Sequence, residues 1–189
     1  MAKGGNFENT VCRKLSLWWT NGERDDVFTR TGGSGGKFTA RKKSGKNTAF
    51  QSGDITFADP IGERLIKCFN IECKTGYGKR TKDSIKKWDL LELLDSRQKE
   101  PVFMQMWNQC CEDAEKSERA PLLIFRRNQM EICIAMYEGE FIDMGWERAD
   151  YLGIVITVTL PHYDEEVVVL SLKDFTEWIK NPQEYFKRC

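Results

Sequence analysis

The sequence of 189 residues lacks several features that would assign a common function directly. It has one histidine, His162, and no Cys-x-x-Cys pair among its seven cysteines, which excludes zinc ribbons and Cys2His2 sites at their known spacings. No apolar run approaches the roughly 18 residues that span a bilayer, and the N-terminus lacks the apolar stretch of a signal peptide. We therefore expect an intracellular, cytoplasmic protein with reduced, mostly buried thiols and no membrane partner.

The chain also has no net charge, with 29 basic and 29 acidic residues, but the two signs are separated along it. Residues 1–50 hold 10 Lys and Arg against 4 Asp and Glu, whereas residues 101–150 hold 5 against 10. Two basic clusters lie in the first half of the chain: Arg30, Lys37, Arg41, Lys42, Lys43 and Lys46, then Lys74, Lys79, Arg80, Lys82, Lys86 and Lys87. Such clusters are typical of a surface that binds a polyanion, and two solvated loops are the alternative.

Length and composition fit a single domain over residues 1–189 with a sizeable core, since 40% of the residues are hydrophobic. Hydrophobic periodicity predicts a first helix with Asn6 as its N-cap and with Phe7, Val11 and Leu15 on one face. Strands are expected over residues 51–57, 65–74, 122–125, 131–137, 154–160 and 167–172, and further helices over 84–98, 101–119 and around 175–179. This order predicts an α/β or α+β fold, with a mixed central β-sheet flanked by helices.

The residues with the clearest chemical meaning lie on the first two expected strands. Asp54 lies on one, and Glu72 and Lys74 lie on the next, where the period of two places them on one face while Ile71 and Cys73 point into the core. If the two strands pair as neighbours, Asp54 lies close to Glu72, and two carboxylates at a strand edge suit Mg²⁺. A lysine beside them can orient or deprotonate a water and offset charge on a phosphate. The pattern outlines metal-assisted phosphodiester hydrolysis, although an exposed charged strand with a surface ion pair is the simpler alternative.

Two further elements accompany these strands. Glu8 lies in the first helix, and Ser34 lies in a Gly-rich loop after Arg30 that matches neither a P-loop nor a dinucleotide-binding motif. Together with Gly53-Asp54-Ile55 and Ile71-Glu72-Cys73-Lys74, they resemble the PD-(D/E)XK nuclease superfamily, and most of all the archaeal Holliday-junction resolvases and their phage relatives. The resemblance covers roughly residues 4–90 and implies a restriction-endonuclease-like core.

The resemblance implies a metal-dependent DNA endonuclease that leaves 5′-phosphate and 3′-hydroxyl ends. It implies that Asp54, Glu72 and Glu8 hold Mg²⁺, or alternatively Mn²⁺, and that Lys74 positions the attacking water. Ser34 would reach the scissile phosphate, the alternative being a turn residue in a flexible linker. Contacts with the phosphate backbone are expected from the basic residues Arg30, Lys37, Arg41, Lys42, Lys43, Lys79 and Arg80.

The expected substrate is branched or junction DNA, cut by a homodimer so that two strands are cleaved symmetrically in recombination or repair. A restriction- or repair-type endonuclease acting on duplex DNA and a non-catalytic nucleic-acid-binding module are the alternatives. Two departures bear on this choice: Gly53 stands where the family usually has proline, and residues 38–48 form a longer stretch than a junction resolvase usually has. The compact single domain would suit a phage or mobile element.

Three other features leave alternatives open. Trp18 and Trp19 fit core or dimer contacts at helical spacing, and a base-stacking platform is the alternative. Gln109 is interpreted as a surface residue, although some superfamily members place a polar helix residue facing the site. Arg126 and Arg127 have acidic neighbours in the sequence and are not assigned to DNA binding.

Overall fold

The structure is a computed structural model that describes residues 3–32, 52–76, 102–127, 129–145, 153–159 and 166–186. The helix expected over residues 84–98 lies outside the described residues. So do Ser34 and most of the expected DNA contacts, namely Lys37, Arg41, Lys42, Lys43, Lys79 and Arg80. None of the helices in the described parts combines the length and the apolar character needed to cross a membrane.

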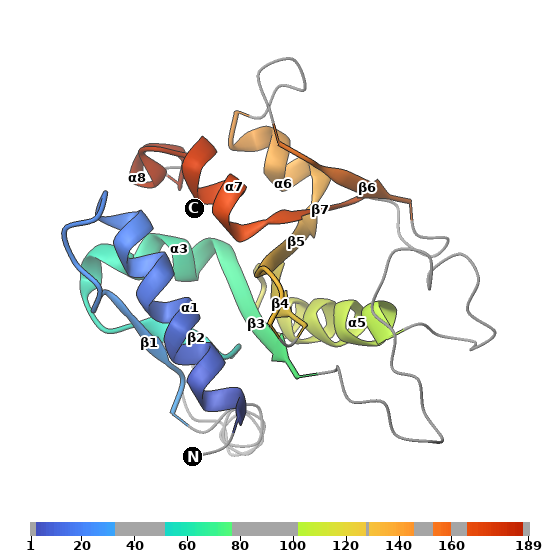
Figure 1. Cartoon of the computed structure of the whole chain (residues 1–189), viewed down its shortest axis with the longest axis horizontal. Coiled ribbons are helices and arrows are strands. Elements are labelled where there is room, and N and C mark those ends of the chain that lie inside the picture. Colours follow the sequence, from blue (N-terminus) through green and yellow to red (C-terminus); the bar gives the residue numbers. More distant parts are fainter. Residues whose placement is uncertain are drawn as a thin grey trace.

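A mixed sheet flanked by helices forms the fold, as the sequence predicts (Figure 1). The helices are α1 (Lys3–Trp19), the 3-10 helix η1 (Pro60–Gly62), α3 (Glu63–Cys68), α5 (Val102–Glu115), α6 (Glu138–Asp143), α7 (Leu172–Trp178) and α8 (Pro182–Tyr185). The strands are β1 (Phe28–Arg30), β2 (Ile55–Phe57), β3 (Phe69–Thr75), β4 (Ala120–Arg126), β5 (Cys133–Tyr137), β6 (Ile156–Val158) and β7 (Val167–Ser171). Five strands pair in the order β3-β4-β5-β7-β6, with β3 parallel to β4 and the other neighbours antiparallel, while β1 and β2 pair as a separate antiparallel ribbon.

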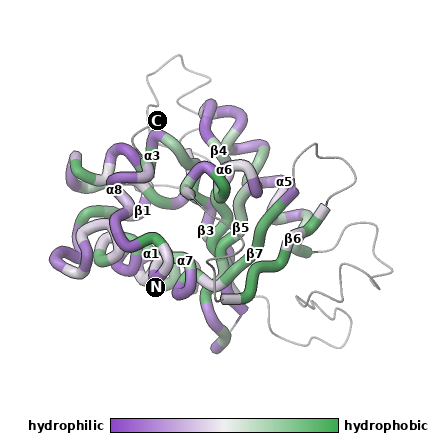
Figure 2. Tube along the Cα trace, turned by 90° about the horizontal axis from the view of Figure 1, so that it is seen from above, coloured by the Kyte–Doolittle hydropathy of each residue, from purple (hydrophilic) through white to green (hydrophobic). Residues whose placement is uncertain are grey.

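Helices α1 and α5 lie on opposite sides of β3 and β4 (Figure 1). The expected α1 face of Phe7, Val11 and Leu15 is buried in the larger hydrophobic cluster, while Trp107 of α5 is buried with Leu123 of β4 in a second cluster. Because consecutive strand residues point to opposite faces, both faces of the central strands are apolar. Figure 2 shows the resulting concentration of hydrophobic residues along β5 and β7. The expected sizeable core is present as these two clusters.

The two adjacent tryptophans belong to this core. Trp18 is 8% exposed and Trp19 is 1% exposed, and their rings pack in a T-shaped arrangement with centroids 5.9 Å apart. The indole nitrogens donate to backbone carbonyls, Trp18 to Ile179 at 2.8 Å and Trp19 to Ile61 at 2.7 Å. Their buried rings are therefore core residues rather than a platform for bases.

The prediction of a strand over residues 65–74 is wrong in its first part. Residues 65–68 belong to α3, and β3 begins only at Phe69. The helical course begins at Asp59, whose carboxylate accepts the Ile61 amide at 3.0 Å, and continues through Pro60, which suits a first helical turn. Leu65 and Ile66 therefore form the buried side of this helix, which a short apolar run does not distinguish from a strand.

Two other local predictions also need correction. Strand β2 has β1 as its ladder partner, with Thr29 opposite Thr56, and does not form a hairpin with β3. Helix α1 begins at Lys3 and not after Asn6, so Gly5 lies within its first turns. A side chain at position 5 would lie 2.9 Å from Nη1 of Arg30, so glycine there leaves room for that guanidinium.

The cysteines follow the expectation of buried thiols with one exception. Cys12, Cys73 and Cys110 are free and buried, and burial raises the pKa of the Cys12 thiol to about 12. Cys68, at the end of α3, is instead disulfide-bonded, so the expectation of reduced thiols is wrong for this residue. The free, buried thiols are poor nucleophiles because the thiolate is the reactive form.

Candidate active site

Asp54 lies where the β1–β2 ribbon meets β3. Its backbone amide donates to the carbonyl of Ile71 at 2.8 Å, and its carboxylate Oδ2 accepts the backbone amide of Cys73 at 2.8 Å. The carbonyl of Asp54 accepts the amide of Thr31, which follows β1. These bonds hold the Asp54 carboxylate beside the backbone of β3, one residue from Glu72, although β2 itself is not paired with β3.

Gly53 makes this approach possible. Its φ is +79°, and a Cβ atom there would lie 2.8 Å from the carbonyl oxygen of Ile71 and 3.0 Å from Oδ1 of Asn70. Proline, with φ fixed near −65°, cannot adopt this backbone conformation. The departure from the usual proline before the first aspartate therefore follows from the close contact between this turn and β3.

Glu72 and Lys74 lie on the face of β3 that α5 covers. Glu72 stands opposite Leu123 in the parallel register, and Leu123 packs with α5. Glu72 is 6% exposed, and its Oε2 lies 3.0 Å from Nζ of Lys74, whose side chain is only 16% exposed. Ile71 and Cys73 are buried in the cluster that includes α1, as the strand period predicts. The Glu72–Lys74 pair is thus mostly buried, unlike an exposed surface ion pair.

Burial and mutual repulsion oppose the ionisation of the two carboxyl groups. Burial raises the pKa of Glu72 to about 7, and the charge of Asp54 adds to the rise while Lys74 opposes it. Burial also raises the pKa of Asp54, against the hydrogen bond from the Cys73 amide, the charge of Lys74 and a hydrogen bond with the Glu72 side chain. Two carboxyl groups can hydrogen-bond only when one of them carries a proton. Both raised pKa values therefore favour protonation of the pair when no cation is bound beside it.

Glu8 approaches this pair from α1. Its side chain is 17% exposed and forms an ion pair with Nε of Arg30, the last residue of β1. The charge of Glu8 contributes to the raised pKa of Asp54, so the two carboxylates are electrostatically coupled. Arg30, expected to contact DNA, is therefore bound to a residue of the candidate site.

Arg119, at the start of β4, fixes the segment before Asp54, and its role was not predicted from the sequence. Its guanidinium donates to the carbonyls of Ile66 at 2.7 Å and of Phe69 at 3.2 Å, and to Oδ1 of Asn70 at 3.0 Å. It also donates to the carbonyl of Ser52 at 3.2 Å and to the Ser52 hydroxyl. Burial lowers the pKa of Arg119 to about 10. It also donates to the nearby Ser117 hydroxyl at 3.2 Å. No local spacing marks its other contacts, because those partners lie 49 to 67 positions earlier in the chain.

A divalent cation fits the donors of this site. Mg²⁺ prefers oxygen ligands and is commonly held by one or two carboxylates while it keeps several waters. Asp54 and Glu72 supply that pair, and their pKa values are raised first by burial and then by neighbouring carboxylates, an effect that a bound cation would oppose. Among the described residues, no three Asp, Glu, His or Cys side chains are grouped as a complete metal site, which agrees with Glu8 being bound to Arg30.

Of three comparisons with known proteins, one found a match. The family model described as "Phage putative PDDEXK endonuclease" matches residues 1–186. The chain belongs to this family. Membership in the phage PDDEXK endonucleases confirms both the PD-(D/E)XK resemblance and the association with phages. The comparison with curated proteins and the comparison with solved structures each found no match.

In this phage PDDEXK endonuclease, the structure brings together Glu8, Asp54, Glu72 and Lys74, with Arg30 beside Glu8. Gln109 is exposed on α5, in agreement with its interpretation as a surface residue. Asp113, four residues further along the same helix, adds to the raised pKa of Glu72 and was not singled out in the sequence. The sequence did offer one signal for Asp113: it follows Gln109 by four residues, so the two lie on the same side of the amphipathic helix.

Proposed function

We propose that this protein is a divalent-metal-dependent endonuclease that hydrolyses phosphodiester bonds in DNA. The observation that supports it most is the buried pair of Asp54 and Glu72 with Nζ of Lys74 3.0 Å from Glu72. Carboxyl groups that only stabilised a fold would gain little from mutual repulsion, whereas a bound cation turns the same repulsion into affinity. Membership in an endonuclease family supports the same conclusion.

In this proposal Asp54 and Glu72 hold Mg²⁺, or alternatively Mn²⁺. When bound, the ion would favour ionisation of water and stabilise charge on the phosphate oxygens. Lys74 orients the attacking water and offsets negative charge on the phosphate. The water oxygen bonds to phosphorus, the bond between phosphorus and O3′ breaks, and O3′ takes up a proton, which leaves 5′-phosphate and 3′-hydroxyl ends.

Glu8 completes the site from α1, through a water or a second metal ion. Its ion pair with Arg30 neutralises both side chains while DNA is absent. Arg30 then exchanges this carboxylate for a backbone phosphate when DNA binds. Ser34 remains the expected contact with the scissile phosphate. Contacts with the rest of the phosphate backbone remain expected from the basic residues Lys37, Arg41, Lys42, Lys43, Lys79 and Arg80.

Branched DNA is the proposed substrate and a homodimer the proposed active form. The support is the resemblance of the first half of the chain to junction resolvases, together with its excess of basic residues. Two identical active sites related by a two-fold axis would cut two strands of a junction symmetrically.

Cleavage of a four-way junction and of a linear duplex of matching sequence tests the proposal, with Mg²⁺, Mn²⁺ or EDTA. The parent protein should cut with either metal ion and not with EDTA. Glu72→Ala and Lys74→Met should each reduce the rate by at least about 100-fold. The matched controls are Glu63→Gln and Lys67→Met. These residues form a similar ion pair, with Nζ of Lys67 3.2 Å from Oε1 of Glu63, on the solvent-facing side of α3.

The outcomes separate the alternatives. Cleavage of the junction alone, with paired cuts, would support the resolvase function. Equal cleavage of the duplex would retain the active site and assign a restriction- or repair-type endonuclease. DNA binding unchanged by EDTA, with no cleavage of either substrate, would contradict the enzyme and leave a nucleic-acid-binding module.

A further inference from the structure

Arg126 lies at the end of β4, close to the candidate active site but outside it. In the parallel register, Phe125 stands opposite Lys74 and Arg126 stands opposite Thr75. Strands β3 and β4 therefore end together at the edge of the sheet that carries Lys74. Arg126 is one register position beyond this lysine.

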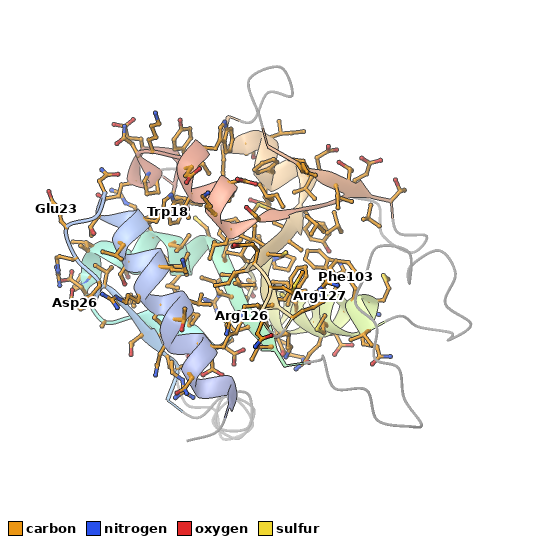
Figure 3. The ribbon with its side chains drawn as sticks, viewed as in Figure 1. Trp18, Glu23, Asp26, Phe103, Arg126 and Arg127 are labelled. Carbon is orange, nitrogen blue, oxygen red and sulfur yellow. The ribbon has the colours of Figure 1, made fainter. Side chains whose placement is uncertain are left out.

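The guanidinium of Arg126 is held against an aromatic ring. Its Cζ lies 4.9 Å from the ring centroid of Phe7, which is 1% exposed and directly precedes Glu8. Figure 3 shows Arg126 between α1 and β3, with Arg127 toward α5. A guanidinium over an aromatic ring keeps its N–H donors in its own plane, where they can meet a planar or tetrahedral oxyanion.

The hydrogen-bonding capacity of Arg126 is not used within the described parts of the chain. Its Nε is buried and has no hydrogen-bond partner, and no ion pair joins Arg126 to a carboxylate there. Arg119 and Arg30 differ in this respect, since the first donates to five residues and the second pairs with Glu8. A buried cationic donor without a partner is costly, which indicates a ligand that the chain itself does not supply.

We propose that Arg126 binds a backbone phosphate of DNA next to the scissile phosphate, with Phe7 as the surface that orients its guanidinium. This inference rests on the proposed endonuclease function and adds a phosphate-binding residue to it. Phosphate oxygens match both the charge and the forked donors of arginine. A single charged contact of this kind adds to affinity irrespective of base sequence and makes binding more dependent on salt.

The test measures binding of a labelled linear duplex in the Lys74→Met background with Mg²⁺, so that DNA is bound and not cut. Fluorescence anisotropy at several salt concentrations gives both Kd and its salt dependence. Arg126→Gln should weaken binding about tenfold and reduce the slope of log K against log salt by about 0.9. The Kd of Arg126→Lys should fall between those of the Lys74→Met parent and Arg126→Gln. Lysine keeps the positive charge but loses the paired guanidinium donors and the contact of the guanidinium with the Phe7 ring.

Arg64→Gln is the matched control, since Arg64 is exposed on α3, at the opposite end of β3 from Lys74. It should leave Kd and the salt slope unchanged. Thermal unfolding gives a second readout: Arg126→Gln should keep or raise Tm, because it removes a buried donor without a partner. A purely structural arginine would instead lower Tm and leave the salt slope as it was.

Equal Kd and equal salt slope for Arg126→Gln, Arg126→Lys and the Lys74→Met parent would overturn the inference and leave the proposed endonuclease intact. Failure of the parent itself to bind any DNA would overturn the proposed function and this inference together. Weaker binding with a reduced salt slope and an unchanged Tm would support both.

Discussion

Glu72 occupies a position where the folded protein disfavours the ionised form of its carboxyl group. Burial is the largest cause of its raised pKa, and the negative charges of Asp54 and Asp113 add to it. Lys74, whose Nζ lies 3.0 Å from Oε2 of Glu72, opposes this rise and favours the ionised form. A carboxyl group in such surroundings reports directly on whether a cation is bound beside it.

The stability of the metal-free protein should therefore depend on pH through Glu72. Its folded pKa of about 7 lies above the ordinary value of 4.5, so between these values the native state binds more protons than the unfolded state. Stability then falls as pH rises through this window and is constant above it. Glu72→Gln should remove this loss and raise stability at pH 8, on the order of 3 kcal/mol, with little change near pH 4.5.

Thermal unfolding in EDTA at several pH values checks this prediction. Glu63→Gln is the control, since Glu63 lies on the solvent-facing side of α3 and pairs with Lys67. Added Mg²⁺ should raise the Tm of the parent protein at pH 8 and not that of Glu72→Gln, because a ligand that binds only the native state stabilises it. A lower Tm for Glu72→Gln at pH 8 would show that the ionised carboxylate is stabilising, contrary to the prediction.

The residues of the site were predictable where strand alternation alone determines their direction. The period of two placed Glu72 and Lys74 on one face and Ile71 and Cys73 on the other, as observed. Gly53 could be noted in the sequence but not explained, because its positive φ arises from contact with a strand 18 residues later. Contacts of that kind leave no pattern in the local sequence.

At the scale of elements, the β1–β2 ribbon meets the main sheet through the buried cluster that holds Ile55 and Ile71 and through polar bonds near Asp54. Asp54 bonds to Ile71 and Cys73, and Arg119 bonds to Ser52 and to the α3–β3 junction. The position of the Asp54 carboxylate therefore depends on a side chain from the start of β4. A strand of three residues such as β1 is too short to show periodicity, which is why its pairing with β2 was not predicted.

Replacement of Arg119 should loosen this junction. Arg119→Met leaves the carbonyls of Ile66, Phe69 and Ser52 without a donor and should lower the free energy of unfolding by about 2–4 kcal/mol. Arg119→Lys should lower the free energy of unfolding by less, because lysine keeps a cationic donor although it lacks the several donors of the guanidinium. Chemical denaturation measures both.

The same variants test whether Arg119 positions Asp54. If it does, Arg119→Lys should need more Mg²⁺ for half-maximal cleavage and should regain most of its activity at saturating metal. Arg13→Met is the control, because Arg13 is exposed and pairs only with Asp25, and it should change stability by less than about 0.5 kcal/mol. An unchanged Mg²⁺ requirement in Arg119→Lys would restrict Arg119 to a role in folding.

At the scale of the whole molecule, the two halves of the sequence contribute differently. The family match extends over residues 1–186, whereas the residues gathered at the site all come from the first 74, with Asp113 and Arg126 approaching from the second half. The sequence motifs therefore predicted the family, and the fold adds groups from α5 and β4 that no motif includes. The order of helices and strands was predictable over most of the described chain, because the hydrophobic periodicity is strong there. The assembly of chains depends on surface contacts, which hydrophobic periodicity does not describe.

In the proposed function, the assembly follows from the branched DNA substrate. Each chain provides one candidate site, so paired cuts in a junction require two chains, and light scattering should give twice the chain mass for the active species. When parent protein is mixed with excess Glu72→Ala, most parent chains should sit in mixed dimers that cut one strand, so nicked junctions should replace paired cuts. The same mixture made with Glu63→Gln, which retains the active site, should still give paired cuts. Paired cuts that persist in proportion to the parent chains alone would show that one chain cleaves both strands in turn, and the homodimer would then not be needed for symmetry.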